Sequence, residues 1–342
     1  EMCIRDRFYA LQELSNRKPL EVSAPSNKLS DYYGSHVFDR KKMQEYLPKE
    51  AYKAVTDAIE KGTPISREIA DLIANGMKSW TQWPREYRKR EPQALEAFKA
   101  ENEEEIGFWK FLQYEFSIQW KKLKAYANAN NVQILGDIPI YVSADSVDAW
   151  VGGPLFELDA DGGFARVAGC PPDYFSAEGQ LWGNPLYNWP YHKQTGYAWW
   201  IQRVRHALGI YDLLRIDHFR GFDTYWAIPA DSTTAKTGKW ETGPRMELFN
   251  ALEGALGKLP IIAEDLGYLT PEVKAMLAES GYPGMKIMQF AFDSRESGNY
   301  LPHTYPRNSV VYTGTHDNVT TEGWRSNASA EDVALSLIHI SE

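Results

Sequence analysis

The stretch YDLLRIDHFRGF, residues 211–222, ends an apolar run in three ionisable side chains, Arg215, Asp217 and His218. In a strand, residues two apart face the same way, so Arg215 and Asp217 are expected on one side, with His218 where the strand ends. A positive charge within about 4–6 Å lowers the pKa of a carboxyl group. We therefore expect Asp217 to be ionised, as a carboxylate nucleophile must be.

A second carboxyl group, that of Glu264, follows the apolar run PIIA. Apolar surroundings raise the pKa of a carboxyl group, which suits a proton donor near neutral pH. One ionised and one protonated carboxyl group, about 5–5.5 Å apart, are the pair that a retaining glycosidase uses. Asp317 supplies a third carboxylate between His316 and Asn318 and is suited to binding sugar hydroxyls.

Each of these residues also has a structural explanation. An Asp after a parallel strand often caps the next helix, and HFRG could be a surface turn. His316 and Asp317 could be metal ligands, but a metal site needs three or four ligands at suitable spacing, and neither H-E-x-x-H nor C-x-x-C occurs. Three carboxylates at the ends of three strands favour a catalytic site, that of a barrel hydrolase or transferase. We expect no metal and no cofactor.

The elements that must position these residues recur from Gln133 onward. Short apolar runs end in polar residues: VQILGDIPIYV, YDLLRIDHF, LPIIAEDL, MKIMQFAFD and SVVYTGTHDN. Continuous apolar runs predict strands that are buried on both faces, hence a parallel sheet. Between them, helical spacing marks WWIQRVRHALGI, MELFNALEGALG and TPEVKAMLAESG, the last with Thr270 as its expected cap and Gly281 at its end.

Repeated strand–helix units form either an open doubly wound sheet or a (β/α)8 barrel. The polar residues favour the barrel, because the C-terminal ends of barrel strands converge on the face where active sites lie. A doubly wound sheet usually carries a Gly-rich phosphate loop, which this sequence lacks. The polar residues at the ends of the runs are Asp137, Arg215/Asp217/His218, Glu264/Asp265, Asp293 and His316/Asp317/Asn318.

The residues before Gln133 predict helices. One apolar face joins Ile69, Ile73 and Met77, and residues 93–131 are expected to form one or two longer helices.

Composition limits the possible partners and the cellular location. The chain has 342 residues, of which 43% are hydrophobic, enough for a sizeable core. Its net charge of −9 argues against a nucleic-acid partner, and no apolar run approaches the ~20 residues that span a membrane. Cys3 and Cys170 cannot form a disulfide framework, which indicates the cytoplasm. The 12 Trp and 20 Tyr predict an aromatic core, and some rings could be platforms for a sugar.

Longer motifs carry a resemblance to a known family. They are ILGDIPIYVSADSVDAW, GCPPDYFSAEGQLWGNPLYNW, LLRIDHFRGFDTYWAIPA, IIAEDLGYLTPEV, PGMKIMQFAFD and VVYTGTHDNVTTEGW. Over roughly residues 81–335 they closely resemble amylomaltase, the 4-α-glucanotransferase of glycoside hydrolase family 77. The resemblance implies a (β/α)8 catalytic barrel and transfer of α-1,4-glucan segments between maltooligosaccharides by double displacement.

The resemblance also implies roles for individual residues. Asp217 would be the nucleophile, Glu264 the acid/base and Asp317 the stabiliser of the transition state. Arg215, His218 and His316 would bind the sugar at the cleavage point, together with Asn318, while Asp137 and Asp293 would line the cleft. PPDYFSAEGQLWGN looks like the family's flexible loop, which would place four residues near the acceptor side: Asp173, Tyr174, Phe175 and Trp182.

The remainder of the chain does not fit this family. Residues 8–80 resemble the N-terminal segment of type III glutamine synthetases, and the ends EMCIRDR and LSLIHISE look like translated sequencing-adapter remnants. We therefore expect a chimera joined near Ser79–Gln82. Its parts would be a foreign helical segment at 1–80, with 1–7 an artefact, a partial catalytic barrel with a helical insertion at 81–335, and an artefact at 336–342. The barrel is expected to be incomplete, without its first and last strands.

Three other functions compete with glucan transfer. An α-glucan hydrolase would use the same residues with water as the acceptor. A truncated chain could instead be an inactive carbohydrate-binding remnant. A ligase function drawn from residues 8–80 is weaker, because no metal-binding or ATP-binding residues of a ligase are identifiable there.

Overall fold

The computed structural model describes residues 79–159, 162–172, 176–267, 269–292, 300–315 and 318–340. The chain divides into two compact units, which are taken separately below. The first comprises residues 1–101 with 145–152, and the second comprises residues 102–144 with 153–342. Apart from Ser79 and Trp80, the helical segment predicted at 1–80 lies outside the described residues.

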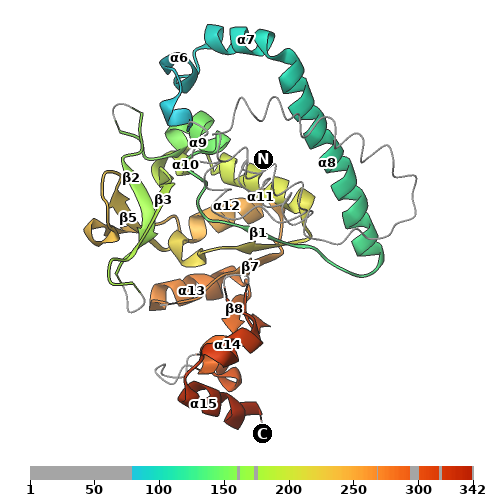
Figure 1. The fold of residues 1–342 in the computed structure, drawn as a ribbon, viewed down its shortest axis with the longest axis vertical. Helices are drawn as coiled ribbons and strands as arrows, with labels where there is room; N and C mark the ends of the chain where they lie inside the picture. Colours follow the sequence, from blue (N-terminus) through green and yellow to red (C-terminus); the bar gives the residue numbers. More distant parts are fainter. Residues whose placement is uncertain are drawn as a thin grey trace, which may run out of the picture. The chain divides into compact units, whose positions relative to one another are not determined.

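The first unit contains four short helical elements in its described part. They are η1 (Trp80–Gln82), α6 (Arg85–Arg88), α7 (Pro92–Glu101) and α9 (Val147–Gly152) (Figure 1). The indole N–H of Trp150 donates to the carbonyl of Tyr87 at 3.0 Å, and the ring of Trp150 meets that of Trp83 edge to face at 5.3 Å. Trp150 therefore ties α9 to the segment around α6.

The second unit is built on parallel strands. Each of the five predicted apolar runs corresponds to one strand. β1 (Leu135–Ile138), β4 (Leu213–Ile216) and β7 (Ile261–Ala263) make one sheet in that order, and β8 (Gly284–Ile287) pairs with β9 (Ser309–Tyr312). The N–H of Ala263 donates to the carbonyl of Pro283 at 2.9 Å, which brings β8 next to β7. The spatial order of these strands thus follows their order in the chain.

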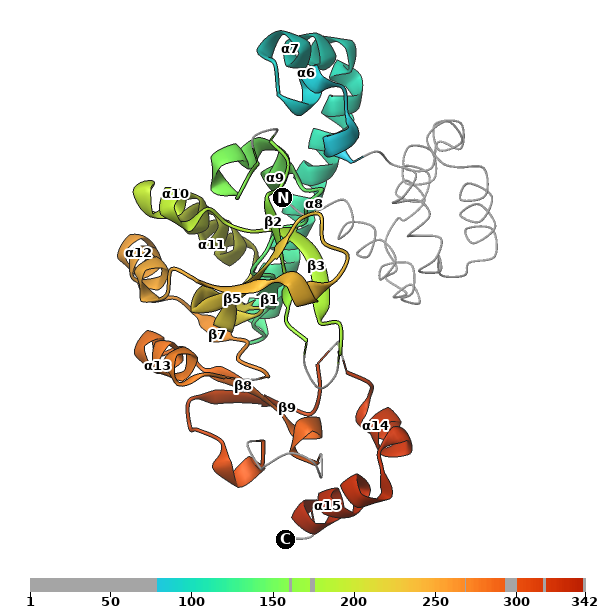
Figure 2. The ribbon, with the colours of Figure 1, turned by 90° about the vertical axis from the view of Figure 1, so that its left-hand side faces the viewer.

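Helices cover one face of these strands. α11 (Ala198–Ile210), α12 (Met246–Leu256) and α13 (Pro271–Ser280) lie in a row beside them (Figure 2). α13 begins and ends as predicted, since Thr270 Oγ1 accepts from the N–H of Val273 at 3.3 Å and Gly281 takes the left-handed conformation at φ 68°. Sequential strand order with helices on one face is typical of a barrel and not of a doubly wound sheet.

The other helical elements of the second unit connect or flank the strands. The long helix predicted before the first strand is α8 (Glu103–Ala129), in which the indole N–H of Trp120 donates to the carbonyl of Ile210 at 2.8 Å. The remaining ones are α10 (Trp189–Gln194), α14 (Thr321–Asn327), α15 (Ala330–Ile340), η2 (Gly153–Leu155), η3 (Phe219–Phe222), η4 (Ala235–Thr237), η5 (Met288–Phe292) and η6 (Pro302–Thr304). In the parts of the chain that the structure describes, every helix is too short or too polar to cross a membrane.

A second, antiparallel sheet was not predicted. Its strand order is β3 (Gln180–Pro185), β2 (Arg166–Cys170), β5 (Thr224–Pro229) and β6 (Lys239–Thr242). β3 takes up part of the stretch PPDYFSAEGQLWGN, for which the resemblance implies a flexible loop. Two of its strands, β2 and β3, follow β1 in the chain, and the other two, β5 and β6, follow β4. The sheet is therefore formed by segments next to the strands that carry the predicted site.

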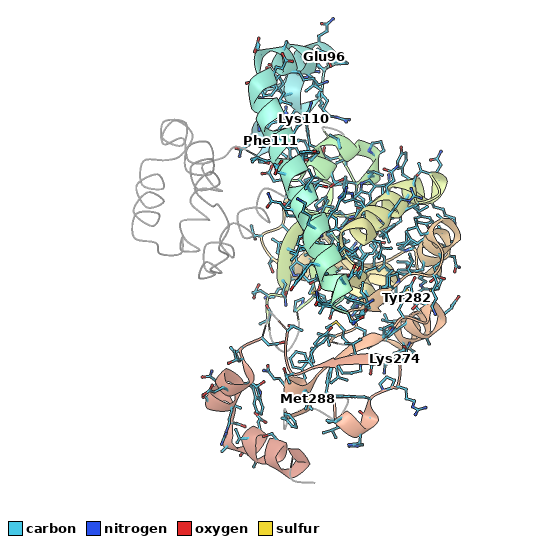
Figure 3. All side chains as sticks on the ribbon, turned by 90° about the vertical axis from the view of Figure 1, so that its right-hand side faces the viewer. Glu96, Lys110, Phe111, Lys274, Tyr282 and Met288 are labelled. Carbon is cyan, nitrogen blue, oxygen red and sulfur yellow. The ribbon has the colours of Figure 1, made fainter. Side chains whose placement is uncertain are left out.

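The core of the second unit is aromatic, as the Trp and Tyr content predicts. Trp200, Phe219 and Phe222 are fully buried. Tyr282, labelled in Figure 3, is also buried, packs on Phe249 with ring centroids 5.7 Å apart, and donates its hydroxyl to Glu253 at 3.1 Å. This packing fixes α12 and α13 against the strands that carry the site.

Candidate active site

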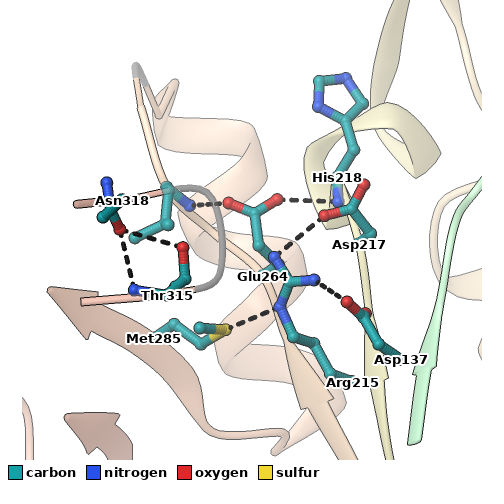
Figure 4. A network of polar contacts seen from close by, with 9 residues as sticks. Asp137, Arg215, Asp217, His218, Glu264, Met285, Thr315 and Asn318 are labelled. Carbon is teal, nitrogen blue, oxygen red and sulfur yellow. Dashed lines mark hydrogen bonds and ion pairs between the residues drawn. The ribbon is translucent and has the colours of Figure 1, made fainter. Parts of the chain in front are cut away.

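Arg215 in β4 is the centre of the polar network at the strand ends (Figure 4). It is buried, and its Nη1 donates to Oδ2 of Asp137 at 2.5 Å, in the neighbouring strand β1, where the two residues are register partners. Its Nη2 forms an ion pair with Oδ1 of Asp217 at 3.0 Å. The prediction that Arg215 and Asp217 share one side is confirmed, and Asp137 joins them there.

Glu264 directly follows β7, the strand that pairs with β4. Its carboxylate accepts two backbone bonds, from the N–H of His218 at 2.7 Å and from the N–H of Leu266 at 2.9 Å. Burial raises the pKa of Glu264 to about 7, and the charge of Asp217 adds to the rise, while the two N–H bonds and Arg215 oppose it. The raised pKa that the apolar neighbours of Glu264 predict is therefore found, while its role as a proton donor stays a prediction.

His218, the residue after Asp217, contacts the aromatic ring of Trp182. The residue has a left-handed backbone, at φ 53°, and its ring meets Trp182 of β3 edge to face at 5.0 Å. Burial lowers the pKa of His218 to about 4, and the charge of Arg220 acts in the same direction. A neutral imidazole can exchange hydrogen bonds with uncharged hydroxyls.

Trp182 comes from the unpredicted sheet and lies beside His218, while the acceptor-side position that the resemblance implies stays a prediction. Its ring is partly exposed and also neighbours the buried ring of Tyr141 at 6.4 Å. An exposed indole beside a neutral histidine offers an apolar face with polar groups at its edge, as a sugar ring requires.

Asn318 holds a turn in the structure. Its Oδ1 accepts from both the N–H and the hydroxyl of Thr315, each at 2.9 Å, and its own N–H donates to the carbonyl of Thr315 at 3.1 Å. Figure 4 shows this turn beyond Glu264, on the side of Met285. These bonds join Thr315 to Asn318.

Six of the thirteen predicted site residues contact at least one other of them in the described structure: Asp137, Trp182, Arg215, Asp217, His218 and Glu264. A seventh, Asn318, bonds Thr315 in the turn beside them. The other predicted residues lie outside the described part of the chain: Asp173, Tyr174, Phe175, Asp293, His316 and Asp317. The roles assigned to all of them remain predictions.

Sequence reasoning missed Met285. Its Sδ accepts from Nε of Arg215 at 3.3 Å, so a buried apolar residue of β8 is part of the polar network. Nothing in the run PGMKIM marks that residue, because its partner is 70 positions away in the chain.

These observations define a barrel-type α/β protein with two carboxyl groups at the ends of neighbouring parallel strands. A family model described as 4-alpha-glucanotransferase matches residues 70–341. The chain belongs to that family, glycoside hydrolase family 77. The recognised similarity of the N-terminal part is also confirmed, since a model of the type III glutamine synthetase N-terminus matches residues 29–84.

Curated relatives agree with the family assignment. The chain is 51% identical over 247 residues to the 4-alpha-glucanotransferase of Clostridium butyricum, covering 72% of this chain and 51% of that protein. It is 46% identical over 271 residues to that of Thermus thermophilus, covering 79% and 54%. The chain thus spans about half the length of the curated relatives it matches.

Solved structures support the same fold. The amylomaltase from Streptococcus agalactiae, solved in complex with acarbose, superposes with a TM-score of 0.75 at 37% identity, covering 98% of this chain and 64% of that one. The amylomaltase from Corynebacterium glutamicum gives a TM-score of 0.58 at 18% identity, covering 97% and 43%, and so shows the fold alone.

Proposed function

We propose that this chain carries the catalytic site of a 4-α-glucanotransferase, which moves α-1,4-glucan segments between maltooligosaccharides with retention of configuration. The observation that carries the proposal is the pair of unlike carboxyl groups. Asp217 is ion-paired with Arg215, while burial beside Asp217 raises the pKa of Glu264 to about 7. Such a pair is what a retaining double displacement needs.

In the first step, the Asp217 carboxylate attacks the anomeric carbon, and the glycosidic bond breaks. Protonated Glu264 gives its proton to the departing oxygen, which leaves as a sugar hydroxyl. The product is a glycosyl ester on Asp217 and an ionised Glu264. Arg215 aims the attacking carboxylate through its 3.0 Å ion pair.

In the second step, ionised Glu264 takes the proton of an acceptor hydroxyl, and that oxygen attacks the anomeric carbon and releases Asp217. The ester has consumed the negative charge that helps to raise the pKa of Glu264. The pKa of Glu264 therefore falls in the intermediate, which keeps the group ionised until it acts as a base.

The other roles come from the family resemblance. We assign stabilisation of the transition state to Asp317, and sugar binding to Arg215, His218, His316 and Asn318. Asp137 and Asp293 would line the cleft, and Asp173, Tyr174, Phe175 and Trp182 would face the acceptor. The amylomaltase from Streptococcus agalactiae was solved with acarbose, and we expect acarbose to compete with donor glucans here.

Incubation of the purified chain with maltotriose tests the proposed function. Glucose together with chains longer than maltotriose would support transfer. Glucose and maltose without longer products would indicate an α-glucan hydrolase. Binding of maltotriose without turnover would indicate a carbohydrate-binding remnant.

We further propose that residues 1–80 have a different origin from the catalytic part and that the protein acts in the cytoplasm. The two family matches support the first point, because they cover different parts of the chain and overlap only at 70–84. Sequencing the source DNA across codons 75–90 tests it, since an uninterrupted genomic reading frame would contradict a chimera. The cysteine content supports the second point.

A further inference from the structure

The guanidinium of Arg215 has three different acceptors in the described structure. Nη1 bonds Asp137, Nη2 pairs with Asp217, and Nε donates to Sδ of Met285 at 3.3 Å. Arg215 and Met285 are both buried. A buried N–H without an acceptor costs free energy, so the sulfur decides whether the guanidinium is stable in this orientation.

Met285 is itself held by a residue that follows Glu264. Oδ1 of the buried Asp265 accepts the N–H of Met285 at 2.6 Å, and its Oδ2 lies 3.4 Å from Nζ of Lys286. At Gly284 a Cβ atom would lie 2.8 Å from both carboxylate oxygens of Asp265. Glycine is therefore required for the close approach that fixes the start of β8, and with it the sulfur of Met285.

We propose that Met285 is a positioning residue, whose thioether fixes the plane of the Arg215 guanidinium and thereby the direction of the Asp217 carboxylate. The catalytic consequence of this inference rests on the proposed function. The contact between Met285 and Arg215 is independent of that function.

The chemistry of the acceptor suits this position. A thioether is a weak, uncharged acceptor, so it satisfies Nε without competing with Asp137 and Asp217 for the positive charge. A carboxylate here would add a negative charge near Glu264, whose pKa already rises through the charge of Asp217. Methionine therefore orients the arginine while leaving the charge balance of the pair unchanged.

The kinetic test compares three variants with the wild type in the maltotriose assay. Met285→Leu keeps the volume but removes the acceptor, and we expect kcat to fall about tenfold with KM within about twofold, because the loss affects the attacking group rather than binding. Met285→Gln restores an acceptor and should recover kcat to within about threefold. Met276→Leu, a buried methionine of α13 in the aromatic core, is the matched control and should change little.

The second measurement does not depend on activity. Hydrogen exchange of the Arg215 Nε–H is followed by NMR of arginine-labelled protein, with the signal assigned by Arg215→Lys. Met285→Leu should speed this exchange at least about tenfold, while Met276→Leu should not. Equal exchange and equal kcat in the two leucine variants would overturn the proposal. A wild type that forms no chains longer than maltotriose would overturn the proposed function alone, because the exchange comparison would still report the contact.

Discussion

The backbone N–H of His218 donates to Oε2 of Glu264 over 2.7 Å. The residue directly after the proposed nucleophile thus holds the proposed acid/base. His218, which supplies this N–H, has a left-handed backbone at φ 53° and lies where the chain leaves β4. The two carboxyl groups are therefore positioned by one short turn, and a change in that turn would move both.

The raised pKa of Glu264 makes stability depend on pH. The group has an ordinary pKa of 4.5 and a folded pKa of about 7. Between these values the folded state binds the proton more tightly, so its contribution to stability is lost as pH rises. Relative to Glu264→Gln, we expect the unfolding free energy of the wild type to fall by on the order of 2 kcal/mol from pH 5 to pH 8. Urea unfolding at both pH values measures this free energy. An equal change from pH 5 to pH 8 in the wild type and in Glu264→Gln would contradict the raised pKa.

The lowered pKa of His192 should make stability depend on pH in the opposite direction. It is fully buried, its Nε2 bonds the carbonyl of Leu155 at 3.1 Å, and burial lowers its pKa from 6.5 to about 4. The unfolded chain takes up the proton first, so stability is lost as pH falls from about 6.5 toward 4. In His192→Phe, the loss of unfolding free energy between pH 6.5 and pH 4, measured by urea unfolding, should be smaller than in the wild type by on the order of 2 kcal/mol. His206→Phe, at an exposed position of α11, is the control and should lose as much unfolding free energy over this pH range as the wild type.

The assigned roles predict opposite trapping behaviour. With an activated fluoro-sugar donor, Asp217→Asn should form no glycosyl-enzyme, because the nucleophile is gone. Glu264→Gln should still react when the leaving group needs no proton, and should then accumulate the ester because the base of the second step is missing. Mass spectrometry of the intact protein reads out both. Trapping by Asp217→Asn but not by Glu264→Gln would reverse the two roles.

Gly284 gives a test of the packing behind the site. A Cβ there would meet both carboxylate oxygens of Asp265 at 2.8 Å, and Asp265 is buried. We expect Gly284→Ala to lower the unfolding free energy by about 1–3 kcal/mol. In the exposed position Gly254 of α12, a Cβ would meet nothing within 4 Å, so Gly254→Ala should raise it by about 0.5–1 kcal/mol. Thermal unfolding of the two variants would show shifts of opposite sign.

The parallel strands could be predicted because their signal is local. The run IIA in β7 is buried throughout, and LLRI in β4 is nearly so, which is why their residues are apolar without alternation. α13 was predictable at both ends for the same reason, since a Thr cap and a left-handed Gly act on their own helix. The raised pKa of Glu264 followed from its apolar neighbours in the sequence.

The antiparallel sheet escaped prediction because its strands carry weak local patterns. β6 is only Lys239–Thr242, mostly exposed, and β3 is largely exposed and contains Gly183 and ends in Pro185. Their stability comes from partners distant in sequence: Arg166 of β2, for example, forms an ion pair with Glu241 of β6, 75 positions away. The contact of Met285 with Arg215 was hidden for the same reason, because it joins residues whose types do not suggest each other.

The contacts of the site join residues far apart in the chain. Arg215 and Asp137 are separated by 78 positions, His218 and Glu264 by 46, and Met285 and Arg215 by 70. Contacts of such long range form late in folding, after their loops have closed. During synthesis, the guanidinium cannot reach its final orientation until β8 has left the ribosome. A nascent chain that ends before β8 would therefore hold both carboxyl groups without the geometry to use them.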